Sequence, residues 1–251
     1  MTTVTTRITV TLKQAADLIA ACPNNRFIVR GEPGIGKSSV LKALKEKHGD
    51  KYDYIYVDCP VLDMSDIGMR IPNHDTRTLE FYASSLFKLD SSKPKMIMLD
   101  EFMKSPKLLQ IIFTRMMLER MAGDRALPKG SRVFATSNNS SDGVGDSMLA
   151  HAGNRVCIME MSKPTANEWL EWAGYPQNAI SRVVRAFVSM FPRCLASYKE
   201  GDVQKDNPYI FKPNGGVLSF VSPRSLAKCD VIVRNRDALG ENATEVALAG
   251  T

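Results

Sequence analysis

The sequence predicts an α/β/α sandwich built on a parallel β-sheet, followed by a small helical domain. Short apolar runs alternate with segments of helical periodicity as far as about residue 160, a pattern typical of parallel sheets connected by helices. The run 96–99 is apolar throughout, as expected of a strand buried on both faces. After Lys163-Pro164 only helical patterns continue. We therefore expect an α/β domain over 1–162 and a mainly helical domain over 163–251.

The predicted elements follow one another regularly along the chain. Thr11 precedes a helical apolar face that stops at Pro23. A strand, a Gly-rich turn and a helix are then expected over 27–30, 31–36 and 38–47. The same patterns predict further strands over 54–57, 96–99, 133–136 and 156–159, and further helices over 105–121, 167–173 and 180–191.

Three segments lack a strong periodic pattern. Two long polar loops are expected over 62–78 and 138–147, and a looser stretch over 201–216. The last five residues, 247–251, have the composition of a helix that is just beginning. The sequence contains no internal repeat.

Composition indicates a soluble globular protein of the cytoplasm. The chain has 251 residues, of which 44% are apolar and 24% charged, enough for a well-buried core. Its 33 Lys+Arg and 27 Asp+Glu give a formal charge of +6, but the basic residues are scattered, so nucleic-acid binding is permitted without being indicated. No apolar run is long enough to cross a bilayer, and the Thr-rich start lacks the apolar core of a signal peptide.

Cysteine and histidine spacing argues against a metal or disulfide framework. The five cysteines are odd in number and far apart, so we expect reduced core thiols. The three histidines are distant from one another and from any cysteine pair, which makes a zinc site improbable on spacing alone.

The strongest motif lies between the strand at 27–30 and the helix at 38–47. Residues 31–38 fit G-x-x-x-x-G-K-[ST] in full and in the required strand-to-helix context. Glycines let backbone N–H groups converge on phosphate oxygens, Lys37 adds a mobile ammonium, and Ser38 would ligate Mg²⁺. A Gly-rich turn with a surface lysine is the alternative, and the complete match disfavours it. The expected nucleotide-binding residues are Gly31, Glu32, Pro33, Gly34, Ile35, Gly36, Lys37, Ser38 and Ser39.

An acid pair follows the buried run at 96–99. Asp100 and Glu101 lie at the edge where open α/β sheets bind their ligands, and the segment matches a Walker B box. Asp100 would hold magnesium through its water shell, while Glu101 would act as general base toward the attacking water. Acids after an apolar run also start helices, but the upstream phosphate loop favours the catalytic interpretation.

Asn138 closes the next predicted strand, in Ala135-Thr136-Ser137-Asn138. Its amide is expected near the same sheet edge, where it could orient the attacking water. On residue type alone, Asn138-Asn139 is equally well explained as a turn former.

Taken in order, these motifs resemble the AAA+ ATPases, and specifically their MoxR-like branch. Motifs particular to that branch are Leu118-Glu119-Arg120, Leu127-Pro128-Lys129-Gly130, Ser222-Pro223-Arg224 and Trp169-Leu170-Glu171-Trp172-Ala173. The resemblance implies that Asn138 is sensor 1, that Arg155 in Ala152-Gly153-Asn154-Arg155 is an arginine finger reaching a neighbouring subunit, and that Arg224 is sensor 2 on a helical lid. On sequence alone, the favoured interpretations are a surface ion-pair residue for Arg155 and a helix-start residue after Pro223 for Arg224.

The resemblance implies an oligomeric machine, expected to be a hexameric ring, that hydrolyses ATP with Mg²⁺ to remodel or activate a protein partner. The sequence departs from the branch over 63–82, where only Asp66-Ile67-Gly68 matches the helix 2 insert and pore-facing loop. The alternatives are a nucleic-acid motor or loader in replication or packaging, favoured by the basic charge, and a nucleotide-gated switch. A small-molecule phosphotransferase ranks lower, because no acceptor pocket is evident in the sequence.

Overall fold

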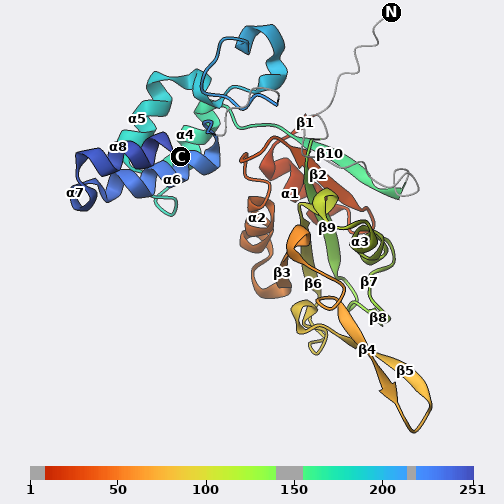
Figure 1. Cartoon of the computed structure of the whole chain (residues 1–251). Coiled ribbons are helices and arrows are strands. Elements are labelled where there is room, and N and C mark those ends of the chain that lie inside the picture. Colours follow the sequence, from red (N-terminus) through yellow and green to blue (C-terminus); the bar gives the residue numbers. More distant parts are fainter. Residues whose placement is uncertain (1–8, 140–154, 214–218) are drawn as a thin grey trace, which may run out of the picture. The chain divides into compact units, whose positions relative to one another are not determined.

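The computed structural model describes residues 9–139, 155–213 and 219–251, which form two compact units (Figure 1). The first contains residues 9–30, 37–139 and 155–161. The second contains residues 31–36, 162–213 and 219–251. Each unit has its own apolar core.

A six-stranded sheet forms the centre of the first unit. Its order is β1 (Thr9–Val10), β10 (Cys157–Met161), β2 (Phe27–Gly31), β9 (Arg132–Asn138), β6 (Lys95–Asp100) and β3 (Asp53–Asp58). The pairs β1–β10, β10–β2, β3–β6 and β6–β9 are parallel. The predicted parallel sheet is therefore confirmed, and β9 lies between β2 and β6.

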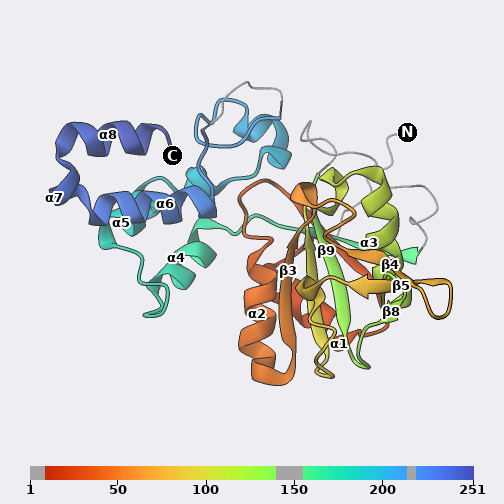
Figure 2. The same ribbon diagram turned by 60° about the horizontal axis from the view of Figure 1, so that its bottom comes forward.

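Helices cover both faces of this sheet (Figures 1 and 2). On one face, α3 (Lys107–Glu119) packs Phe113 and Met116 against Ile97 and Leu99 of β6. Side chains alternate along a strand, so Met96 and Met98, also fully buried, point to the other face. There α1 (Leu12–Ala21) and α2 (Ser39–His48) lie against each other. These layers form the predicted α/β/α sandwich.

The segment expected to be a polar loop over 62–78 contains a strand. Here β4 (Gly68–Asn73) and β5 (Thr78–Ala83) form an antiparallel hairpin, and a shorter hairpin joins β7 (Met121–Ala122) to β8 (Arg125–Ala126). The loop prediction is wrong because the apolar alternation in β4 is limited to Met69 and Ile71, and Pro72 next to them disfavours a strand on sequence alone. The expected polar loop over 138–147 lies mostly outside the described residues.

The second unit is mainly helical in its described residues. Its helices are α4 (Ala166–Gly174), α5 (Arg182–Met190), α6 (Pro223–Arg234), α7 (Arg236–Leu239) and α8 (Glu241–Ala249). Trp169, Val184 and Leu226 belong to its core. Residues 247–251 were expected to begin a helix, but α8 ends at Ala249. This prediction is wrong because the helix starts with mostly polar residues, 241–245, so that only its last turn has a clearly apolar composition.

All five cysteines are free, but only two are core thiols. Cys59 and Cys194 are buried, whereas Cys157 is exposed and the others are half-buried. Burial raises the pKa of the Cys194 thiol to about 11. Among the described residues, no helix is long and apolar enough to span a bilayer.

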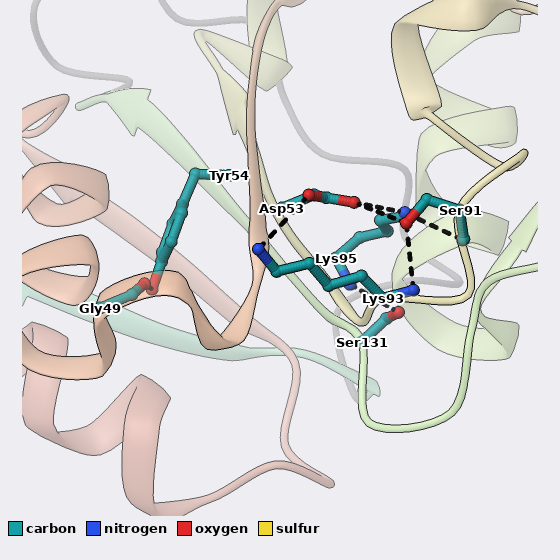
Figure 3. Close-up of polar contacts among 7 residues, drawn as sticks. All are labelled: Gly49, Asp53, Tyr54, Ser91, Lys93, Lys95 and Ser131. Carbon is teal, nitrogen blue, oxygen red and sulfur yellow. Dashed lines mark hydrogen bonds and ion pairs between the residues drawn. The ribbon is translucent and has the colours of Figure 1, made fainter.

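A buried ion pair joins the edge strand β3 to β6 where both strands begin (Figure 3). The side chain of Lys95 is fully buried, and its Nζ donates to Asp53 Oδ2 at 2.7 Å and to the Ser91 carbonyl at 3.1 Å. The backbone N–H of Lys95 donates to Ser131 Oγ at 2.9 Å. The hydrogen bond from Lys95 is the main reason that the pKa of Asp53 is held below its usual value.

Replacing Asp53 by Asn should destabilise the first unit by about 3 kcal/mol at neutral pH, because it leaves a buried ammonium without its counter-charge. The pKa of Asp53 is lowered by folding, so its stabilisation is present above about pH 4 and is lost as pH falls through the folded-state pKa. Urea unfolding of wild type and Asp53→Asn across this range measures the difference, which should shrink in acid.

The control is Lys93→Ala. Lys93 Nζ lies 3.8 Å from Asp53 Oδ1 and is 37% exposed, so its loss should cost less than about 1 kcal/mol. Equal effects of the two variants would contradict a special role for the Lys95–Asp53 pair.

Candidate functional site

The carboxyl ends of three neighbouring strands meet at one edge of the sheet. The strand β2 leads into the glycine-rich loop, β6 ends at Asp100, and β9 ends at Asn138. Because β9 separates β2 from β6 in the sheet, the end of β9 lies between the ends of these two strands. Two side chains that begin the helix after the loop make contact across this edge.

Lys37 and Ser38 reach the ends of two different strands. Lys37 Nζ donates to Asn138 Oδ1 at 2.7 Å, and Ser38 Oγ donates to Asp100 Oδ2 at 3.1 Å. Ser38 precedes α2 in helical geometry, and its hydroxyl makes no capping hydrogen bond within that helix. Four of the sequence-predicted residues therefore lie together in the first unit.

The carboxylate of Asp100 is the most densely bonded group of this site. Besides Ser38, it accepts hydrogen bonds from Tyr56 Oη at 2.8 Å and from Thr136 Oγ1. Thr136 is completely buried, whereas Tyr56 is 48% exposed. Burial and the neighbouring Asp100 carboxylate raise the pKa of Tyr56 well above its usual value, which keeps the phenol a donor.

Tyr56 and the hydroxyl of Thr136 are site groups that no sequence motif marks. Thr136 lies two residues before Asn138, so the alternation of side chains along β9 places the two on one face. That signal was available once Asn138 had been singled out. Tyr56 could not be found in this way, because its contact depends on the pairing of β3 with β6.

Glu101 follows Asp100 in a left-handed backbone conformation. Its φ is 50°, which is uncommon for a residue other than glycine and is found preferentially at functional sites. Its carboxylate Oε2 lies 2.5 Å from Lys104 Nζ, and its backbone N–H donates to Thr136 Oγ1 at 3.4 Å. The side chain is 34% exposed, so water can reach it.

Residues 31–36 of the loop belong to the second unit. Gly34 and Gly36 have φ of 75° and 96°, values that favour glycine. A Cβ on Gly34 would lie 2.6 Å from Ser222 Oγ, so this position also lacks space for a side chain. The backbone N–H of Arg224 donates to the Gly34 carbonyl at 3.2 Å, which places the start of α6 beside the loop.

The other loop side chains differ in where they lie. The Glu32 carboxylate is buried and accepts a hydrogen bond from Ser197 Oγ within the second unit. Ile35 is buried, Pro33 is half-buried and Ser39 is exposed. Any contact of residues 31–36 with phosphate would therefore come chiefly from their backbone N–H groups.

The structure does not bring Arg155 to the cluster around Asp100. Parallel pairing places Cys157 beside Phe27, so Arg155 lies where β10 and β2 begin. The five residues of β2 from Phe27 to Gly31 span roughly 13 Å toward the opposite edge. Arg155 is exposed, and the residues Ala152, Gly153 and Asn154 of its motif lie outside the described residues.

The donors at this edge suit magnesium. Mg²⁺ prefers oxygen ligands and is usually held by one or two protein groups together with phosphates and water. A hydroxyl and a carboxylate, from Ser38 and Asp100, are in hydrogen-bond contact here. The described residues contain no group of three or more His, Cys, Asp or Glu that could hold a metal by itself. This donor set fits a metal bound jointly with a phosphate ligand.

A parallel sheet with this strand order, a phosphate-loop sequence after β2 and an acid pair at the end of β6 define the P-loop nucleoside triphosphatase fold. No family model and no curated protein matches the chain. Among solved structures, a candidate ATPase from Cytophaga hutchinsonii is similar, with a TM-score of 0.48 and 16% identity over 96% of this chain and 81% of that one. A likeness at this level carries no functional argument, which has to come from the site.

Removing the Thr136 hydroxyl should be costly because it deprives a buried carboxylate of a donor. We expect Thr136→Val to lower the free energy of unfolding by about 2 kcal/mol. Thr114→Val is the matched control, since Thr114 is also buried but its hydroxyl donates to the uncharged Gln110 carbonyl, at 2.6 Å. Urea denaturation should show a loss of about 1 kcal/mol or less for the control. A smaller loss for Thr136→Val than for the control would contradict this account of Asp100.

Proposed function

We propose that this chain is an AAA+ ATPase of the MoxR-like branch that hydrolyses ATP to ADP and phosphate. It acts in an oligomer, proposed to be a hexameric ring in the cytoplasm, and remodels or activates a protein partner. The observation that carries the proposal is the meeting of Lys37, Ser38, Asp100 and Asn138 at one sheet edge, directly beside Glu101.

Nucleotide binding would exchange hydrogen bonds that the site makes within itself. Lys37 would turn from Asn138 Oδ1 to the β- and γ-phosphates, which frees the Asn138 amide to orient the attacking water. Ser38 Oγ would turn from Asp100 toward Mg²⁺, and Asp100 would accept from water in the metal's shell. Bound Mg²⁺ would screen the charge of the phosphates.

Glu101 is the general base of the proposed mechanism. Its carboxylate must give up Lys104, 2.5 Å away, before it can take a proton from water. Both side chains are partly exposed, so the pair is weak, worth up to about 1 kcal/mol. A modest rearrangement around η4 (Phe102–Lys104) is enough to free the base.

Arg155 would act on a neighbouring subunit, because it lies at the opposite sheet edge from the Asp100 cluster of its own chain. A guanidinium supplied across an interface stabilises the negative charge of the transition state and makes turnover depend on assembly. Arg224, whose backbone contacts Gly34, would report on the nucleotide from the helical unit as sensor 2.

The β4–β5 hairpin is the part of the first unit that we propose contacts the protein partner. Met69, Leu79 and Tyr82 are each more than half exposed on it, and apolar side chains gathered on one small element favour a protein contact. The formal charge of +6 keeps a nucleic-acid partner as the alternative.

The experiment is steady-state Mg·ATP hydrolysis per subunit, measured over a wide range of protein concentration. We expect specific activity to rise with concentration, because each active site needs an arginine from a second copy. Arg155→Ala should lower the rate at high concentration at least about 100-fold, on the scale of arginine-finger effects. Glu101→Gln should abolish turnover at every concentration.

The matched control is Arg115→Ala. Arg115 is an exposed arginine of the same unit, paired with Glu119 at 2.7 Å, and it should leave the rate unchanged. A slow rate that depends neither on concentration nor on Arg155 would contradict the oligomeric machine and favour a monomeric nucleotide switch. Stimulation by DNA with steep salt dependence would favour the nucleic-acid motor instead.

A further inference from the structure

Tyr56, on the edge strand β3, donates a hydrogen bond to Asp100 that has no part in the mechanism proposed above. Its hydroxyl donates to Asp100 Oδ2 at 2.8 Å, a shorter contact than the 3.1 Å from Ser38 to the same oxygen. The side chain is only about half buried, and this hydrogen bond holds its hydroxyl against Asp100.

The hydrogen bonds of Asp100 divide into a permanent and an exchangeable set. A carboxylate offers about four acceptor positions, and the described side chains fill three of them, from Ser38, Tyr56 and Thr136. Metal binding requires Ser38 to turn away, which leaves Thr136 on Oδ1 and Tyr56 on Oδ2. These two donors then fix the plane of the carboxylate, while the remaining positions on it stay open to metal-bound water.

We propose that Tyr56 is a positioning residue for magnesium: it holds Asp100 Oδ2 where the water shell of the metal needs an acceptor. This inference rests on the proposed function and names a residue that sets the metal affinity of the same site. Without Tyr56, the carboxylate would keep only Thr136 as a lasting donor and would turn more freely. The conformational entropy lost when the Asp100 side chain is ordered would then oppose metal binding.

The chain supplies a close control on the same strand. Tyr54 lies two residues before Tyr56, and alternation along β3 places both on one face. Its hydroxyl donates to the Gly49 carbonyl at 2.9 Å (Figure 3) and has no bond to Asp100. Tyr54→Phe and Tyr56→Phe therefore delete the same atom from the same face, but only one of them touches the site.

The test measures Mg²⁺-dependent binding of a fluorescent ATP analogue at equilibrium, so that it does not depend on turnover. For Tyr56→Phe we expect the half-saturating Mg²⁺ concentration to rise about tenfold, the scale of one lost hydrogen bond to a charged group. For Tyr54→Phe it should stay within about twofold of wild type, as should binding of the analogue to either variant in EDTA. A structural defect would weaken binding in EDTA as well.

An unchanged magnesium requirement in Tyr56→Phe would overturn the inference while leaving the proposed function intact. An equal rise in Tyr54→Phe would also overturn it, because the effect would then come from the order of β3 and not from Asp100. If wild type binds no analogue at any Mg²⁺ concentration, the proposed function fails and this inference fails with it.

Discussion

The carboxylate of Asp100 is the constraint on which the candidate site depends. It stands at the end of a strand in which every residue is buried, and three hydroxyl donors come to it from separate elements. Ser38 belongs to the start of α2, Tyr56 to β3 and Thr136 to β9. A buried charge requires such donors, so the position of this one carboxylate fixes how three parts of the first unit approach one another.

The paired strands β3 and β6 carry charged residues at both of their ends, and the partners of these residues differ between the two ends. Where β3 and β6 begin, Asp53 pairs with the buried Lys95 and also accepts a hydrogen bond from Ser91 Oγ. Where they end, Asp58 lies beside Asp100, and Glu101 follows, so acids gather at this end. The first end can do no more than stabilise the sheet. The second offers a carboxylate that hydroxyl donors orient, which suits a group that must accept from metal-bound water.

Most of what sequence could predict here is local in the chain. The helix start after Thr11, the apolar run of β6 and the phosphate-loop motif each lie within a few residues, and their strands and helices formed as expected. The features that were missed depend on pairing between distant segments. Tyr56 reaches Asp100 only through the β3–β6 register, and the β4–β5 hairpin forms from strands whose apolar alternation extends over only three residues each. The roles assigned to Asn138, Arg155 and Arg224 remain predictions from family resemblance.

Equilibrium binding of ATP in the presence of Mg²⁺ tests the central claim most directly, with Glu101→Gln as the reference protein so that no turnover occurs. The account predicts that this variant binds ATP as tightly as wild type. It also predicts that adding Lys37→Ala weakens binding at least about tenfold, since a charge-assisted contact with phosphate is lost. Equal affinity with and without Lys37 would show that the nucleotide does not occupy this sheet edge and would contradict the account.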